Sequence, residues 1–209
     1  MQLQIEGLEP GKRIDQRFAF GIIDPETHVA LGANRNPGIR WGEPPAGTRS
    51  LVLVCVDTDV PTRPDDVNQE GREVPASLPR AKFYHWLMVD IPPRAGHIAE
   101  AACSDGVTPR GKSGPPGPAA TRQGQNDYTG WFANDEDMAG SYLGYDGPCP
   151  PWNDSIPHHY HFSLYATDLE RCPVEGAFTG AELEAAIAGH VLAEAHVTGV
   201  YSLNPAVDI

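Results

Sequence analysis

Three short apolar runs, each closed off by turn residues, most constrain what this chain can fold into. The first is the unbroken run Leu51–Val56, and the second is Phe83–Ile91, which Pro92 and Pro93 stop. A third, at about Tyr160–Ala166, follows a loop rich in glycine and proline. Short runs with β-branched residues and such borders are typical of strands. We therefore predict three strands, and we expect Leu51–Val56 to be a central strand buried on both faces.

Glycine and proline punctuate the whole chain, with 22 and 21 residues among 209. There is no internal repeat and no heptad pattern, so a sheet-rich protein with long loops is expected. The length suits a single domain over residues 1–209. Two stretches without periodicity, 62–82 and about 104–146, are predicted to be long loop insertions. A loop of that length inside a compact domain tends to be functional when it is ordered.

One helix is predicted near the C-terminus. Thr179 and Glu182 stand in the spacing of a capping box, which starts a helix. Leu183, Ile187 and Val191 then fall on one face at intervals of four. The segment HVTGVYSL that follows is expected to form a final strand.

Charge and composition exclude some partners. The formal net charge of −13 repels nucleic acid and anionic membranes. No stretch approaches the ~20 apolar residues that cross a bilayer, and the first residues lack the apolar core of a signal peptide. We therefore expect a cytoplasmic protein without stable membrane insertion. Its four cysteines show no C-x-x-C spacing, so free thiols are expected.

Polar side chains gather where the predicted strands end. If the strand pattern continues past Val56, Asp57 and Asp59 share one face, and Pro61 fixes the exit of the chain. His85 falls among apolar neighbours of its own strand, where an imidazole must find a partner or line a cavity. The neighbours predicted to share its face are Leu87, Val89 and Ile91.

The histidines of the third strand do not form one cluster. Alternation directs His158 and Tyr160 inward, and it directs His159 and His161 to the opposite, more polar face. Each polar residue alone indicates little, because an aspartate at a strand end is usually a turn former. What points to a site is their combination: two carboxylates before a proline, a histidine on the next strand, and a Gly-Pro loop leading to His and Tyr.

This combination resembles the phosphatidylethanolamine-binding protein family, in its bacterial YbhB/YbcL-like branch. The family signature D-P-D-A-P with a downstream histidine corresponds here to DTDVPT and YHWLMVDIP. Its second signature, G-P running into H-R-Y, corresponds to GPCPPWNDSIPHHYHFSLYA. The resemblance extends from about Leu51 to the C-terminus. Three positions depart from the pattern: Thr58 and Val60 replace Pro and Ala, and His159 replaces an arginine, which puts any salt bridge of that arginine in doubt.

The resemblance implies a mainly β fold, a sandwich of two antiparallel Greek-key sheets with a C-terminal helix and long loops. It also implies a non-enzymatic protein, without metal or cofactor, whose pocket binds a small anion such as phosphate or a phospholipid head group. A homodimer and a regulatory role like that of eukaryotic inhibitors of kinases and proteases are implied as well. By motif position the pocket residues are Asp57, Asp59, His85, Gly147, Pro148, His158 and Tyr160.

An anion site that contains two carboxylates needs compensating charge. Protonation of His85 or His158 could supply it, since a neighbouring carboxylate favours the charged imidazole. Backbone N–H groups of the DYTG and GP loops and the Tyr160 hydroxyl could donate to phosphate oxygens. A zwitterionic phosphoethanolamine would use both kinds of residue. This hypothesis predicts tighter binding near pH 6 than near pH 8.

Two other interpretations stay open at the level of sequence. Asp57, Asp59, His85 and His158 could form a hydrolase site, with or without a divalent metal, although no nucleophile motif, H-E-x-x-H or P-loop is present. A structural or assembly role would leave the pocket vestigial. Cys149, inside the Gly-Pro loop, could make the pocket redox-sensitive or simply fill space.

Overall fold

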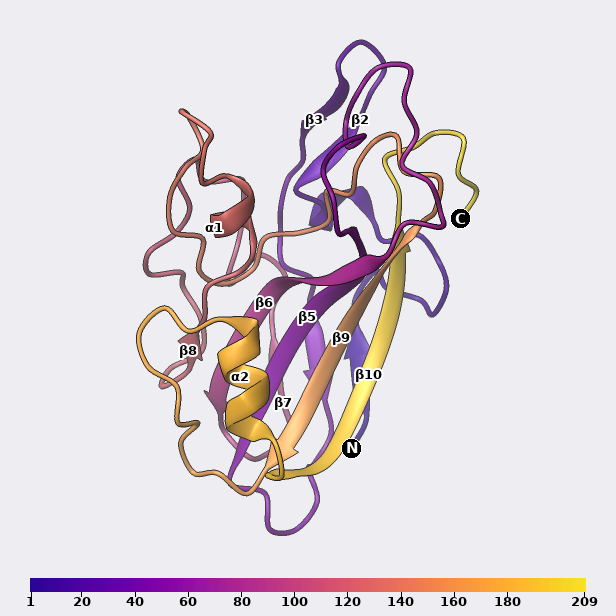
Figure 1. The fold of residues 1–209 in the computed structure, drawn as a ribbon. Helices are drawn as coiled ribbons and strands as arrows, with labels where there is room; N and C mark the ends of the chain where they lie inside the picture. Colours follow the sequence, from indigo (N-terminus) through magenta and orange to yellow (C-terminus); the bar gives the residue numbers. More distant parts are fainter.

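The three predicted strands lie next to one another in an antiparallel sheet of five strands. We describe them in a computed structural model that covers residues 1–209 (Figure 1). The strand order is β10-β9-β5-β6-β8, and every neighbouring pair is antiparallel. The strands are β5 (Ser50–Pro61), β6 (Arg80–Ile91), β8 (Arg122–Gln123), β9 (His158–Thr167) and β10 (Val191–Tyr201).

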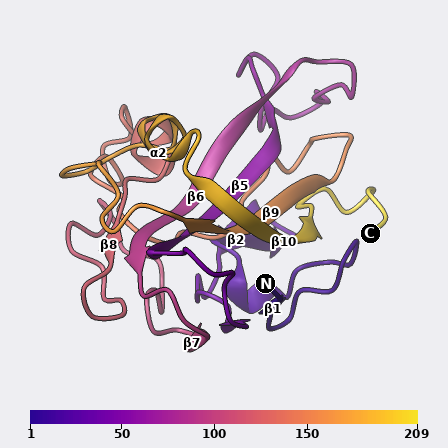
Figure 2. The same ribbon diagram turned by 90° about the horizontal axis from the view of Figure 1, so that it is seen from below.

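A second, three-stranded antiparallel sheet packs on one face of the large sheet. Its strands are β1 (Leu3–Ile5), β4 (Ile39–Trp41) and β7 (Gly96–Ile98), in the order β1-β4-β7. A separate hairpin joins β2 (Gly21–Asp24) to β3 (His28–Leu31). The helices are a 3₁₀ turn at Gln16–Phe18, α1 (Tyr128–Trp131) and α2 (Gly180–Ile187). Figure 2 shows α2 on the opposite face of the large sheet from β1.

The alternation of β5 divides the interior into two cores. Leu51 and Leu53 pack toward the small sheet, while Val52 and Val54 pack toward α2. All four side chains are buried, which confirms the prediction of a central strand covered on both faces. The chain crosses between the sheets from β4 to β5, from β6 to β7 and from β7 to β8. The mainly β, two-sheet architecture expected from the resemblance is therefore present.

The C-terminal helix is shorter than predicted. Thr179 caps it through both halves of a capping box with Glu182, as expected. It ends at Ile187, however, and Gly189 adopts a left-handed conformation with φ of 81°. Val191 does not continue the helical face but begins β10 and is exposed. The glycine turn and the β-branched residue after it outweigh the period-four pattern.

Two bulges interrupt the alternation of β6. At each bulge β6 contains one residue more than the facing part of β5. The first extra residue is His85, and the second lies between Met88 and Ile91. Leu87 and Val89 consequently pack beneath α2, whereas the ring of His85 meets that of Tyr160 on the other side, 5.1 Å between centroids. The prediction that His85 shares a face with Leu87 and Val89 is wrong, because period-two counting holds only in a strand without bulges.

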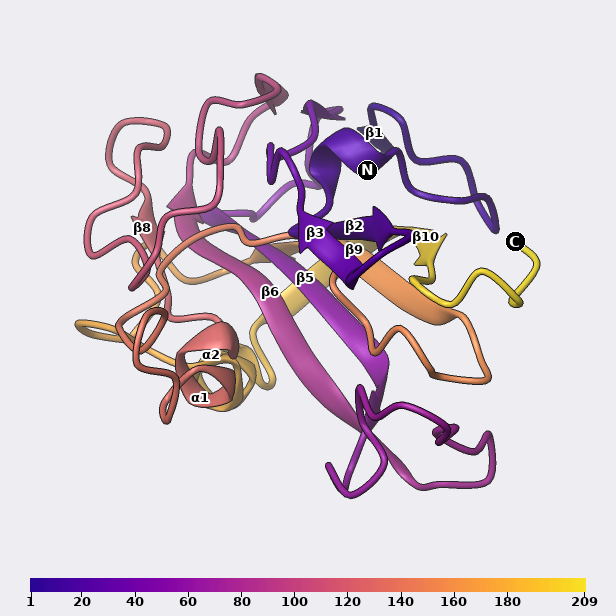
Figure 3. The ribbon, with the colours of Figure 1, turned by 90° about the horizontal axis from the view of Figure 1, so that it is seen from above.

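The connection from β5 to β6 covers residues 62–79, since β6 already begins at Arg80. The side chain of Asn153 fastens this loop: its Nδ2 donates to the carbonyl oxygens of Asp66, Gln69 and Arg72. Its Oδ1 accepts from the backbone N–H of Asn68 at 2.9 Å. The loop is therefore attached to the segment that leads to His158. Figure 3 shows it projecting beyond the ends of β5 and β6.

Two further observations bear on the sequence predictions. All four cysteines are free, as expected. None of the helices has the length and apolar character that a membrane crossing requires.

Candidate functional site

Four of the predicted site residues meet inside the sandwich. Asp57 on β5 lies opposite Tyr160 on β9 in the antiparallel register, and His158 begins β9. The bulge in β6 brings His85 to the same side. Asp57, His85, His158 and Tyr160 are each at most 2% exposed. The site is therefore closed in this structure, and its charges interact in a medium of low polarity.

His158 lies between two carboxylates. Its Nδ1 is 2.6 Å from Oδ2 of Asp57, and its Nε2 is 3.1 Å from Oδ2 of Asp154. Burial alone would lower the pKa of His158, but Asp57 and Asp154 outweigh it and raise the pKa to about 9. The imidazole is thus a cation at neutral pH that donates both N–H groups to protein carboxylates. It has no donor left for a ligand.

Asp154 is a member of the cluster that sequence reasoning missed. Arg80 binds its carboxylate with two N–H groups, at 2.5 and 3.1 Å, and also donates to the carbonyl oxygen of Asp59. Burial acts to raise the pKa of Asp154, but the bonds to His158 and Arg80 lower it below the usual value. Asp57, His158, Asp154 and Arg80 therefore form one chain of alternating charge. The only sequence signal was an aspartate four residues before His158.

Asp59 is not brought into this buried cluster. Its Oδ2 accepts from the backbone N–H of His159 and contacts the ring Nδ1 of His159 at 2.9 Å. His159 lies on the outer face of β9 and is exposed. Asp57 and Asp59 therefore contact histidines on opposite faces of β9, His158 and His159 respectively. In this chain the residue at the position of the arginine in the H-R-Y signature, His159, contacts Asp59, and the contact is a salt bridge only when His159 is protonated.

His85 faces the site as a neutral ring. Its Nδ1 lies 2.8 Å from the carbonyl oxygen of Asp146, which can only accept, so Nδ1 carries the proton. Burial lowers the pKa of His85, although the Asp57 carboxylate opposes this shift. The free lone pair is therefore on Nε2, which forms no hydrogen bond with the protein. The positive charge considered for His85 in the anion hypothesis is absent at neutral pH.

A buried polar network holds the backbone that orients His85. The Asp146 carboxylate accepts from Lys112 Nζ at 2.8 Å, Asn34 Nδ2 at 2.7 Å and Asn126 Nδ2 at 2.9 Å. The backbone N–H of Asp146 also donates to the carbonyl oxygen of His85. The long 104–146 segment thus fixes the tautomer of a histidine on β6. No local sequence pattern connects these residues.

Gly147 and Pro148 are buried beside this network, but their backbone groups are already engaged. The N–H of Gly147 donates to Asn34 Oδ1 at 2.8 Å, and the carbonyl oxygen of Pro148 accepts from Phe20 and Gly21. The expected N–H donors of the GP loop are therefore not available to a ligand. The two residues instead position the loop.

The Tyr160 hydroxyl is one of two buried groups of the site without a hydrogen-bond partner, and the other is Nε of Arg80. The hydroxyl is buried and no acceptor meets hydrogen-bond geometry around it, although the Asp57 carboxylate lies near enough to interact with the hydroxyl. A buried donor without a partner disfavours folding by about 1–3 kcal/mol. Burial first, and then Asp57, raise the pKa of Tyr160 well above the usual value, so the hydroxyl stays protonated and can donate. The rings of Tyr160 and His85 are in edge contact with centroids 5.1 Å apart, and further aromatic rings pack around His85: Tyr128 lies 5.5 Å and Phe83 4.9 Å from its ring centroid.

Cys149 borders the same aromatic cluster. Burial raises the pKa of its thiol to about 12. Since the thiolate is the reactive form, this thiol is poorly nucleophilic, which favours the space-filling interpretation over the redox-sensitive one.

The site thus offers a protonated hydroxyl, a basic imidazole nitrogen and aromatic walls, with its formal charges paired among themselves. No group of three or more His, Cys, Asp or Glu side chains is arranged to hold a metal ion. This differs from the metal-ligand set considered for a hydrolase.

Comparison with known proteins gives matches over almost the whole chain. A family model described as phosphatidylethanolamine-binding protein matches residues 4–202. The UPF0098 protein YbcL of Escherichia coli (strain K12) is 28% identical over 174 residues, 83% of this chain and 74% of that protein. A UPF0098 protein of Methanothermobacter thermautotrophicus is 31% identical over 177 residues, 85% of this chain and 89% of that protein.

Solved structures give the same result. The crystal structure of Escherichia coli YbcL, described as a new member of the mammalian PEBP family, superposes with a TM-score of 0.66 and 26% identity. It covers 96% of this chain and 97% of that one. A Chlamydia trachomatis homolog, CT736, superposes with a TM-score of 0.63 at 23% identity over 96% of each chain, a likeness of fold.

Proposed function

Because this chain belongs to the phosphatidylethanolamine-binding protein family, we propose that its His85–Tyr160 site binds a small oxyanion such as a phosphate or phospholipid head group. The observation that supports this most directly is the buried Tyr160 hydroxyl without a partner. A protein retains such a group at a cost in stability, which a ligand that accepts a hydrogen bond from the hydroxyl would offset. No nucleophile or metal is needed for this role.

A phosphate monoester in its monoanionic form matches the two free groups. One of its oxygens accepts from Tyr160, and its remaining P–OH donates to the Nε2 lone pair of His85. The second pKa of such an ester is about 6, so the monoanion becomes abundant as the pH falls. In a zwitterionic head group the ammonium would face Asp57, whose second oxygen, Oδ1, already accepts from the N–H of Asp59.

Access requires movement of the aromatic cover. Phe20 stacks on Tyr128 with centroids 4.5 Å apart, and Phe132 lies 5.6 Å from Tyr128 and 5.9 Å from Phe20, so the three rings form a triangle. These rings join the base of the β2–β3 hairpin to α1. We infer that the ligand enters as these two elements separate, which makes association slower than diffusion.

The test is calorimetric titration of phosphoethanolamine into wild type, Tyr160→Phe and Tyr142→Phe at pH 6. Tyr142 is a matched control, because its hydroxyl is bonded to the carbonyl oxygen of Met138 outside the site. We expect Tyr160→Phe to lose binding while its stability is unchanged or raised by about 1–3 kcal/mol. Tyr142→Phe should bind like wild type. Equal affinity of wild type and Tyr160→Phe would refute the proposal.

The pH dependence separates two sources of the proton. His158 stays charged from pH 6 to 8 and does not contribute to the change. Phosphoethanolamine should bind more tightly near pH 6 than near pH 8, because either the ligand or His85 gains a proton. Sulfate, which does not titrate in this range, should show the increase only if His85 itself is protonated. A flat profile for phosphoethanolamine would contradict the model.

We also propose that the protein forms a homodimer through the free edge of β10. Backbone groups of residues 11–14 form hydrogen bonds with those of Thr198 and Val200. The even-numbered residues of β10 therefore direct their backbone N–H and C=O groups away from β9. The segment 11–14 does not reach Val191–Val197, so this part of the edge is uncovered. A two-fold axis at Ala195 would place Glu194 opposite His196 of a second copy, where the carboxylate can accept from an imidazole N–H.

Light scattering tests this dimer with Glu194→Pro, which removes an outward N–H without breaking the bond to β9. Wild type should have twice the mass of the variant. A monomeric wild type would refute the proposal.

We propose further that occupancy of the site controls a protein partner, the regulatory role that the family resemblance implies. A partner captured on immobilised wild type should be released by phosphoethanolamine and retained by Tyr160→Phe. Release from both proteins alike would contradict it.

A further inference from the structure

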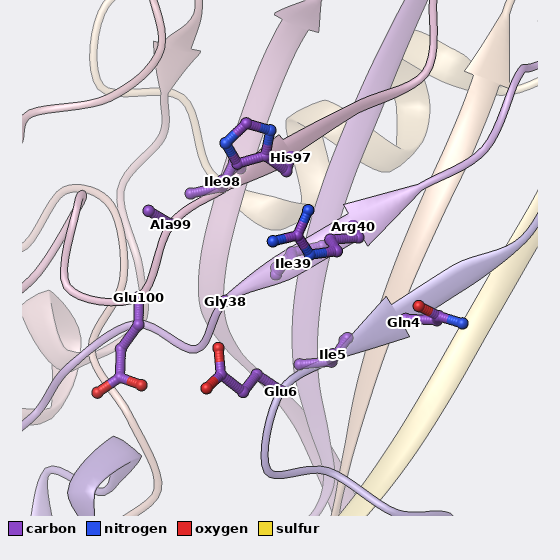
Figure 4. A pocket seen from close by; sticks show the side chains of 10 residues that line it. All are labelled: Gln4, Ile5, Glu6, Gly38, Ile39, Arg40, His97, Ile98, Ala99 and Glu100. Atoms are coloured by element: carbon purple, nitrogen blue, oxygen red, sulfur yellow. The ribbon is translucent and has the colours of Figure 1, made fainter.

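A groove of about 500 Å³ crosses the outward face of the small sheet and shares no residue with the site described above (Figure 4). Three polar side chains form a row across it. Gln4 on β1 pairs with Arg40 on β4, and Arg40 pairs with His97 on β7. Directly paired residues have Cβ atoms about 5 Å apart, so one small ligand can touch all three side chains.

Gly38 lies in the middle of the groove and adds no side chain to it. A Cβ atom at this position would lie 2.6 Å from Oε2 of Glu6, closer than real contacts. Figure 4 shows Arg40 and His97 on one side of Gly38, and Glu6 and Glu100 on the other. The groove therefore has a basic end and an acidic end.

At the acidic end two arginines are shared among four carboxylates, because Arg17 also pairs with Asp15 and Arg35 also pairs with Asp105. Arg17 lies 3.7 Å from Glu6 and 3.3 Å from Glu100, and Arg35 lies 3.7 Å from Glu100. Arg40 and His97, in contrast, are exposed and form no ion pair or side-chain hydrogen bond with the protein. Arg40 is therefore the cation of the groove that has no carboxylate partner, while Glu6 and Glu100 keep the opposite end acidic.

We propose that this groove is a second binding site, for a small oxyanion held by Arg40, with His97 and Gln4 as further donors. The guanidinium presents paired N–H groups that match a carboxylate or phosphate. The volume is within the usual range for small-molecule sites. This inference does not rest on the proposed function of the buried site.

The experiment is an NMR titration of the full chain carrying Tyr160→Phe, so that the buried site does not contribute. Succinate and inorganic phosphate are added separately, which distinguishes the two sources of an oxyanion. We expect saturable shifts of the Gln4, Arg40 and His97 amides for at least one probe, with a Kd on the order of 1 mM. Adding Arg40→Gln should weaken binding about tenfold or more, a loss of one favourable charge contact.

Arg63→Gln is the matched control, because Arg63 is also exposed but lies in the 62–79 loop. It should leave the titration unchanged. Gly38→Ala offers a second variant that narrows the groove without changing charge and should also weaken binding. Absence of saturable shifts for both probes, or equal affinities of the Arg40→Gln and Arg63→Gln proteins, would overturn the second site.

Discussion

Raising the pH should destabilise this protein through one residue, His158. Its pKa is about 9 in the folded chain and 6.5 in the unfolded chain. A raised folded pKa contributes stability that is fully present below pH 6.5 and is lost as the pH rises through about 9. The full contribution is about 3 kcal/mol, since each pKa unit corresponds to about 1.4 kcal/mol. Between pH 6 and 8.5 about 2 kcal/mol of it should disappear.

Urea unfolding followed by tryptophan fluorescence measures this loss. With an m-value of about 2 kcal/mol/M, the midpoint should fall by about 1 M urea between pH 6 and 8.5. His158→Gln is the control, because it keeps every other titrating group, including the cysteines. Its midpoint should be lower than that of wild type at pH 6, and the gap should narrow at pH 8.5. A constant gap, or a His158 ring that titrates near pH 6.5 in NMR spectra, would refute the assignment of charge.

Two further predictions concern the long segments. Asn153→Ala removes the attachment of the 62–79 loop and should cost about 2–4 kcal/mol, roughly 1 kcal/mol for each lost bond. Hydrogen exchange should show faster opening confined to 62–79, and uniform acceleration would contradict this. Lys112→Met leaves the Asp146 carboxylate buried without its cation and should cost about 3–5 kcal/mol. Nitrogen NMR of His85 should then show a changed Nδ1 signal, whereas an unchanged ring would mean that Lys112 does not position it.

The strands that carry the site could be predicted from the sequence, but most contacts among its buried side chains could not. Apolar runs located β5, β6 and β9, because short β-branched segments with turn borders have few alternatives. Alternation correctly directed His158 and Tyr160 inward and His159 outward. These predictions depend only on neighbours along one strand.

The predictions failed where contacts between distant parts of the chain determine the position or the partners of a side chain. A bulge is not visible in a residue pattern, so the face of His85 was misassigned. The partners of Asp146 come from positions 34, 112 and 126, and only the fold brings them together. Asp154 was overlooked because an aspartate after Pro-Trp-Asn is most simply a turn residue. The charge on His158 follows from these unseen partners.

The attachment of the 62–79 loop by Asn153 allows the sequence of the loop to diverge during evolution. Three of its four contacts are to carbonyl oxygens and the fourth is to a backbone N–H. Because backbone groups are common to nearly all amino acids, most side chains of the loop can be replaced without loosening it. Selection can therefore change the side chains of this projecting loop while the residues around His158 stay as they are.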